Sequence, residues 1–169
     1  MKFTELSLHK DLYQGIVDAG FTDCMPVQEK ALQYTLNQND VLVQSQTGTG
    51  KTIAFLISIF QNLLSDNNPH TRALIIVPTR ELAVQVEKEA ELLSPHLTYK
   101  YGSIYGGVGY SKQLKLIQDK AEIIIATPGR LIDHYESGAI KLKDFSILVI
   151  DEADRLFDMG FYKDIQYIT

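Results

Sequence analysis

Short apolar runs, each followed by a segment with helical spacing, constrain the fold of this chain more than any other feature. The runs lie at residues 41–43, 73–77, 99–105, 123–126 and 147–150. A strand that is apolar throughout is typical of a sheet buried on both faces, and strand–helix alternation requires crossover connections. We therefore predict an α/β fold with a mainly parallel sheet and helices on both faces.

Helices are predicted before and between these runs. Apolar residues recur every three or four positions after Ser7, which can cap a first helix that Gly20 ends. A second helix is predicted over 26–36, where a proline stands at the start, and a third over 80–93.

Composition excludes several classes of protein. The net charge of −5 argues against binding nucleic acid through bulk positive charge. The single cysteine, Cys24, excludes an internal disulfide and a cysteine-based metal site. No apolar run approaches the roughly 20 residues that a membrane span needs, and no signal peptide is visible, so we expect a cytoplasmic protein without a membrane partner.

A glycine-rich loop lies between the run at 41–43 and an apolar helical segment. Glycines let backbone N–H groups face a phosphate, and the helix N-terminus adds its dipole. Lys51 can reach the β- and γ-phosphates, and the Thr52 hydroxyl can bind Mg²⁺. The other predicted nucleotide-binding residues of this loop are Gln46, Thr47, Gly48, Thr49 and Gly50. Ser45 stands where the strict pattern has glycine, and a plain glycine-rich turn is the alternative.

Two adjacent carboxylates follow the run at 147–150. Placing both at the end of a buried strand is costly unless a cation lies beside them. Asp151 could hold Mg²⁺, and Glu152 could orient or deprotonate a water molecule. Taken alone, the pair could equally be an acidic helix start.

Two further clusters follow predicted strands and open helices. Thr79 with Arg80, and Thr127 with Arg130, combine free N–H groups with a cation, which suits phosphates of a sugar-phosphate chain. Gly107 would let a backbone approach closely. Because parallel strands end at one edge of a sheet, we expect all these clusters to share that edge. Ordinary capping with a surface arginine is the alternative for each.

The segment 20–28 contains Phe21 and Gln28, whose ring and amide could stack on adenine and hydrogen-bond its edge. Taken by itself, this segment is better explained as a helix–loop–helix corner with a proline at a helix start.

Taken together, the ordered clusters resemble the DEAD-box RNA helicase family. The matching stretches are 20–28, 48–52, 78–83, 106–107, 127–130 and the sequence Asp-Glu-Ala-Asp at 151–154. Further details in 82–86, 109–115 and 155–161 resemble the bacterial RNA-degradosome helicases.

The resemblance implies a RecA-like P-loop domain that uses ATP and Mg²⁺. It assigns adenine to Phe21 and Gln28, catalysis to Lys51, Asp151 and Glu152, and the metal to Thr52 and Asp151. It places Thr79, Arg80, Gly107, Thr127 and Arg130 along RNA. It also implies N-terminal helices with the adenine-sensing segment over 1–37 and an incomplete core over 38–169.

An RNA helicase of this kind would also have a second RecA-like domain, which this sequence lacks, so we expect the chain alone to hydrolyse ATP negligibly. Expected partners are RNA, the second domain and RNA-degradation machinery. The alternatives are a P-loop ATPase acting on DNA, a GTPase, and a non-enzymatic RNA-binding scaffold with a vestigial nucleotide site. The guanine motif Asn-Lys-x-Asp is absent from the sequence.

Overall fold

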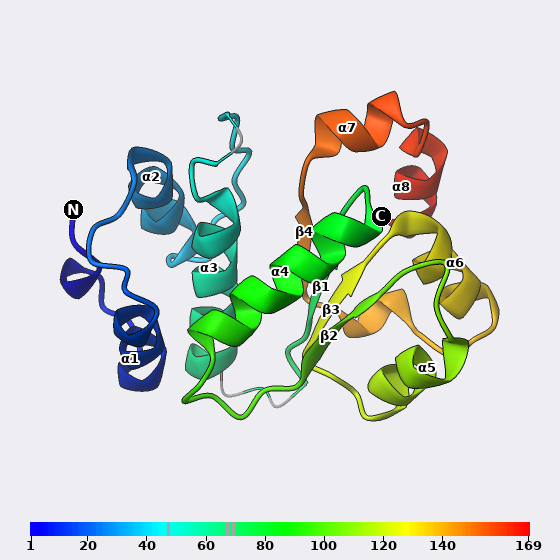
Figure 1. Cartoon of the computed structure of the whole chain (residues 1–169), viewed down its shortest axis with the longest axis horizontal. Helices are drawn as coiled ribbons and strands as arrows, with labels where there is room; N and C mark the ends of the chain where they lie inside the picture. The colour runs from blue at the N-terminus through cyan, green and yellow to red at the C-terminus, as the bar shows by residue number, and fades with distance from the viewer. Residues whose placement is uncertain (47, 67, 69) are drawn as a thin grey trace. The chain divides into compact units, whose positions relative to one another are not determined.

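The chain divides into two compact units, which a computed structural model describes for residues 1–46, 48–66, 68 and 70–169. The first unit comprises Met1–Pro69 and Lys88–Thr98, and the second comprises His70–Glu87 and Tyr99–Thr169. The boundary between them falls inside one helix, α4 (Arg80–Leu93), which Figure 1 shows in green.

The first unit is helical. A short 3-10 turn, η1 (Phe3–Glu5), precedes α1 (Lys10–Asp18), α2 (Pro26–Thr35) and α3 (Lys51–Ser65). The long apolar helix α3 contacts both α1 and α2 and buries most of its side chains. The predicted helices of this region are therefore confirmed.

The predicted cap of the first helix is wrong. His9 occupies the N-cap position of α1, and its Nδ1 accepts a hydrogen bond from the Asp11 N–H at 3.3 Å. Ser7 lies too far before the first turn to reach those N–H groups. Gly20 does follow the end of α1, with a φ of +80° that favours glycine.

The predicted strand at 41–43 is also wrong. These residues form irregular chain, with Leu42 98% exposed and Val41 42% exposed. A strand needs a hydrogen-bonded neighbour strand and a face to bury, and this short apolar run has neither among the residues that the structure describes.

The second unit contains the parallel sheet, in which the four strands run in the order β2-β3-β1-β4. The strands are β1 (Ala73–Ile76), β2 (Tyr101–Ile104), β3 (Ile123–Ala126) and β4 (Ile147–Ile150). In register, Ile75 of β1 lies between Ile125 of β3 and Val149 of β4. These strands confirm the prediction for the four corresponding apolar runs.

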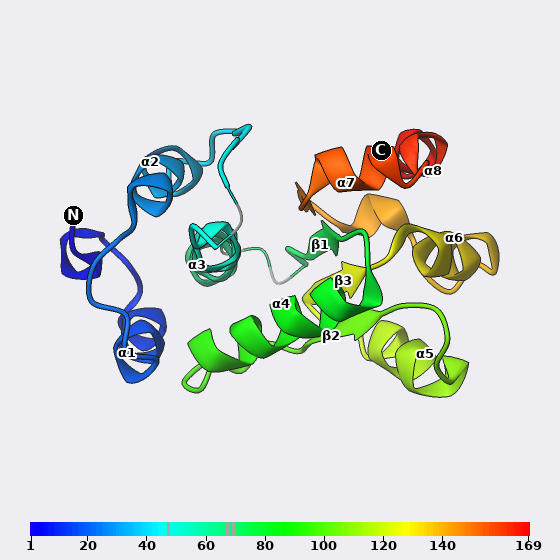
Figure 2. The same cartoon turned by 45° about the horizontal axis from the view of Figure 1, so that its top comes forward.

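Four helices and a 3-10 turn complete the second unit. They are α5 (Tyr110–Gln118), α6 (Pro128–Glu136), η2 (Leu142–Asp144), α7 (Ala153–Asp158) and α8 (Tyr162–Ile168). Figure 2 shows α6 and α8 beside one another near the C-terminus, and the two helices are in contact.

The core of this unit lies between one face of the sheet and these helices. Its buried side chains include Leu74, Ile76, Ile124, Leu131 and Leu156. Ile75 and Ile125 point to the other face and are fully buried as well, so the two central strands are covered on both faces. Burial of each such isoleucine contributes about 1.5–3 kcal/mol. The edge strand β4 is only partly covered, and Leu148 in it is 46% exposed. None of the helices, over the residues that are described, is long and apolar enough to cross a membrane.

Candidate functional site

The glycine-rich loop of the first unit curls around the ammonium group of Lys51. Lys51 is the first residue of α3, and its Nζ donates to the carbonyl oxygens of Ser45 and Gln46, each at 2.8 Å. It also lies 3.2 Å from the Ser45 Oγ. The partly buried cation is therefore held by the loop, at the N-terminus of a long helix where an anion would be favoured.

Hydroxyl groups and left-handed glycines hold the loop in this form. The Thr49 Oγ1 donates to the Gln46 carbonyl at 2.8 Å and lies 2.9 Å from the Ser45 Oγ. Gly48 and Gly50 have φ angles of +76° and +78°, which a side chain would strain. Thr52 is partly buried in the first turn of α3. Thr47, also predicted to bind nucleotide, lies outside the described residues.

Gln28 connects the segment before α2 to this loop. The buried amide accepts from the Met25 N–H at 2.8 Å and donates to the Gly50 carbonyl at 3.1 Å. A methyl group on Gly50 would collide with the same amide. Phe21 is partly exposed in the same unit, with its ring centroid 6.5 Å from that of Phe3. Adenine recognition by Gln28 and Phe21 stays a prediction, but Gln28 does lie beside the loop.

The two adjacent carboxylates lie in the second unit, directly after β4. Asp151 is 8% exposed, and its Oδ1 accepts from the Glu152 N–H at 2.9 Å. Glu152 has φ and ψ of +49°, a conformation that costs a non-glycine residue about 1–2 kcal/mol. Its carboxylate lies 3.1 Å from the Arg155 Nη1. Backbone strain of this kind clusters at functional sites.

Arg80 and Gly107 are neighbours at the ends of β1 and β2. The Arg80 guanidinium lies 5.4 Å from the ring centre of Tyr105, and a methyl group on Gly107 would lie 3.9 Å from the Arg80 Nη1. Gly107 has a φ of +82°, which requires glycine-like freedom. Thr79 caps α4 by accepting from the Leu82 N–H at 3.2 Å, as the capping alternative also expects.

Arg130 lies in the first turn of α6, after the N-cap residue Thr127. Its Nη1 donates to the Gln113 Oε1 at 3.2 Å and lies 3.5 Å from the Val108 carbonyl oxygen. The guanidinium is also 5.6 Å from the ring centre of Tyr110. Each predicted RNA-contacting arginine is therefore accompanied by a tyrosine of the segment after β2.

Three residues beside these arginines were not predicted from the sequence: Tyr105, Tyr110 and Gln113. The two tyrosines carry no spacing signal in the sequence. Gln113 does carry one, because it shares a helical face with Leu116 and Ile117, where a polar side chain needs buried partners.

The prediction of a shared edge is confirmed within the second unit. Thr79, Gly107, Thr127 and Asp151 follow four strands that run parallel in one sheet, so they lie at its carboxyl edge. Lys51 belongs to the other unit, and its convergence with Asp151 stays a prediction.

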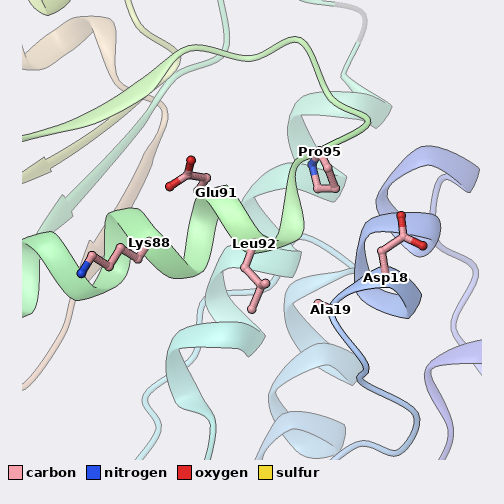
Figure 3. A pocket seen from close by; sticks show the side chains of 6 residues that line it. All are labelled: Asp18, Ala19, Lys88, Glu91, Leu92 and Pro95. Atoms are coloured by element: carbon pink, nitrogen blue, oxygen red, sulfur yellow. The ribbon is translucent and has the colours of Figure 1, made fainter.

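One surface hollow has no link to these clusters. Figure 3 shows it between the end of α1 and the last turns of α4, with a volume of about 410 Å³. Its lining residues are Asp18, Ala19, Lys88, Glu91, Leu92 and Pro95, none of which is a predicted site residue. In the part of the chain described, no group of three His, Cys, Asp or Glu side chains could hold a metal ion.

Comparison with known proteins decides the family. The model of the DEAD/DEAH box helicase family matches residues 25–169. This chain belongs to the DEAD/DEAH box helicase family. The resemblance predicted from the ordered motifs is thus confirmed.

Curated and solved relatives agree with this membership. The ATP-dependent RNA helicases RhlB of Histophilus somni and Shewanella pealeana are 47% and 44% identical to this DEAD-box chain over 99% of its length. The chain spans about 40% of the length of these relatives.

Two crystal structures are also similar. A DEAD box protein from Methanococcus jannaschii has a TM-score of 0.92 and 37% identity, covering 99% of this chain and 46% of that one. A hypothetical ATP-dependent RNA helicase from Sulfolobus tokodaii has a TM-score of 0.87 and 36% identity, covering 95% and 46%. These similarities confirm the RecA-like fold class.

Proposed function

We propose that this chain is the ATP-binding and RNA-contacting part of an ATP-dependent RNA helicase that couples ATP hydrolysis to remodelling of RNA duplexes. The observation that carries the proposal is the similarity to RhlB helicases over 99% of the chain. The Lys51 ammonium, which the glycine-rich loop holds, and the two arginines that lie beside tyrosine rings support it from the site itself.

In this proposal the loop at 45–52 holds the phosphates of ATP. When ATP binds, Lys51 exchanges its bonds to the Ser45 and Gln46 carbonyls for bonds to β- and γ-phosphate oxygens. Its charge is therefore compensated both without and with ATP. Phe21 and Gln28 contact adenine. The hydroxyl of Thr52 and the buried carboxylate of Asp151 are oxygen donors of the kind that Mg²⁺ prefers, and they would hold it. The ion would supply neutralisation of charge on the phosphates.

Glu152 is proposed to orient the attacking water. Its left-handed backbone and its ion pair with Arg155 restrict where the carboxylate can point. A carboxylate held in one place can accept a proton without the entropy cost of positioning itself.

RNA is proposed to lie along the edge of the sheet in the second unit. Thr79, Arg80, Gly107, Thr127 and Arg130 would contact sugar and phosphate groups, which carry no base information. A few fixed arginines explain how a chain of net charge −5 could bind a polyanion.

We further propose that rapid hydrolysis depends on a second RecA-like domain. Arginine fingers in such enzymes contribute about 10³–10⁵ in rate, and the relatives are longer than the region they share with this chain. The same proposal divides the chain into N-terminal helices over 1–37 and a RecA-like core over 38–169. It also includes an association with RNA-degradation machinery and a cytoplasmic location.

The test is a titration of Mg²⁺-ATP and of single-stranded RNA into wild type, Lys51→Ala and the matched control Lys112→Ala, which changes an exposed lysine. We expect Lys51→Ala to bind ATP at least about tenfold more weakly than wild type, and we expect the control to bind ATP as wild type does. RNA binding should be unchanged in both variants. Equal, absent ATP binding in wild type and Lys51→Ala would favour the scaffold alternative. Preference for DNA over RNA of equal length would favour a P-loop ATPase acting on DNA. Preference for GTP over ATP would favour a GTPase.

A further inference from the structure

A buried glutamine on α5 links two elements of the proposed RNA edge. Gln113 is 5% exposed. Its Nε2 donates to the carbonyl oxygen of Tyr105 at 2.9 Å, and its Oε1 accepts from the Arg130 Nη1 at 3.2 Å. Tyr105 begins the loop that contains Gly107. One amide therefore joins the glycine loop after β2 to the arginine of α6.

The remaining contacts of the Arg130 guanidinium are weaker. The Val108 carbonyl oxygen lies 3.5 Å from the Arg130 Nη1, which is the limit of a hydrogen bond. The Asp133 Oδ2 lies 3.5 Å from the Arg130 Nε, but this Nε forms no hydrogen bond. The Tyr110 ring centre is 5.6 Å away. The bond to Gln113 is therefore the shortest hydrogen bond that fixes this guanidinium.

We propose that Gln113 is a positioning residue for RNA binding, which holds Arg130 and the glycine loop in one arrangement before RNA arrives. The proposal rests on the proposed function, in which Arg130 and Gly107 contact the RNA backbone. A flexible arginine loses side-chain freedom when it binds a phosphate, and pre-positioning removes that cost from the binding step.

Of the three side chains of similar length, glutamine, glutamate and methionine, glutamine alone meets both requirements at this position. A carboxamide carries one donor group and one acceptor group, whereas a glutamate carboxylate carries only acceptors and a methionine carries neither useful group. Glutamate could therefore still hold Arg130 but would release the Tyr105 carbonyl. Comparing glutamate with methionine at this position therefore separates the bond to Arg130 from the bond to the Tyr105 carbonyl.

The first measurement uses the whole 169-residue chain and a fluorescein-labelled single-stranded oligouridine as probe. Gln113→Met is compared with Gln118→Met, a matched control that changes an exposed glutamine on the same helix. We expect Gln113→Met to weaken RNA binding about three- to tenfold, the equivalent of immobilising one flexible side chain. We expect the control to bind as wild type does.

A double-mutant cycle shows whether the effect passes through Arg130. In an Arg130→Ala background, Gln113→Met should cause little further loss, because the group it positions is already gone. Arg130→Ala should also reduce the slope of log affinity against log salt by about 0.7, the value for one phosphate contact on a single strand. An equal loss from Gln113→Met in both backgrounds, or no loss in either, would overturn the proposal.

A second readout does not need RNA. In nitrogen-15 NMR spectra, the Arg130 guanidinium signals should show restricted rotation in wild type and in Gln113→Glu, and measurably faster rotation in Gln113→Met. If wild type binds no oligouridine, the RNA-contacting part of the proposed function fails, whereas the NMR comparison still tests whether Gln113 holds Arg130 in place. If Gln113→Met does not fold, Gln113→Glu decides it, because free rotation of Arg130 in that variant would contradict the proposal.

Discussion

Replacing Gln28 with methionine tests how the segment before α2 is coupled to the glycine-rich loop. The substitution keeps the length and volume of the side chain, so it creates little cavity, and it removes both hydrogen bonds of the amide. The Gly50 carbonyl keeps its bond from the Ala54 N–H at 3.2 Å. The Met25 N–H loses its only described partner.

The magnitude follows from these bonds. The two lost hydrogen bonds cost about 1–1.5 kcal/mol each. Met25 is 42% exposed, so water can replace the partner that its N–H loses. We therefore expect a loss of about 2–3 kcal/mol in the free energy of unfolding, or a fall of about 4–12 °C in Tm for a chain of this size.

Urea unfolding followed by circular dichroism measures the loss, with Gln33→Met as the matched control on an exposed position of the same helix. A change below about 0.5 kcal/mol for Gln28→Met would refute the reasoning, because surface substitutions have effects of that size. Nucleotide titration then separates two roles of Gln28. Weakening of ATP and GTP binding together indicates an effect through Gly50, whereas weakening of ATP binding alone indicates recognition of adenine.

Three further predictions concern single positions. A methyl group at Gly15 of α1 would collide with the backbone carbonyl of Leu93, so Gly15→Ala should lower the free energy of unfolding by about 1–3 kcal/mol. At an uncrowded helix position the same substitution usually raises this free energy by up to about 1 kcal/mol. An unchanged or raised urea midpoint for Gly15→Ala would contradict the expected loss. Glu152→Gly removes the strain of a left-handed backbone at a non-glycine residue, so it should raise Tm by about 2–4 °C. The same substitution should abolish ATP hydrolysis in a complete helicase. A lower Tm would argue against strain at this position. Burial, and then the charge of Arg130, hold the pKa of His134 below its ordinary value of 6.5. The unfolded chain therefore takes up a proton first as the pH falls through 6.5, so stability should decrease below that pH, and less so in His134→Phe. Equal pH dependence of Tm in the two proteins would exclude this contribution.

The sheet strands of the second unit could be predicted from sequence because their information is local. The apolar runs at 123–126 and 147–150 match β3 and β4 residue for residue. Such runs are too short for helices and too apolar for loops, so burial in a parallel sheet is the solution open to them. The same reasoning failed at 41–43, because a strand also needs a neighbour that sequence alone does not supply.

The local backbone geometry of the candidate site was predictable where it requires a particular residue. Glycine at a positive φ, as at Gly48 and Gly107, and a lysine at the start of a helix are visible in the sequence itself. The hydrogen-bond partners of these residues were not visible. Nothing in the order of residues pairs Gln28 with Gly50 or Gln113 with Arg130.

The amino-acid order by itself determined the alternation of buried strands and helices, and therefore the edge at which Arg80, Arg130 and Asp151 follow their strands. Tertiary structure alone decided that Tyr105 lies under Arg80 and that one amide on α5 ties Arg130 to the glycine loop. The physical reason is range. Periodicity and backbone preference act over a few residues, whereas a buried polar side chain takes whichever partner the packed chain brings within about 3 Å.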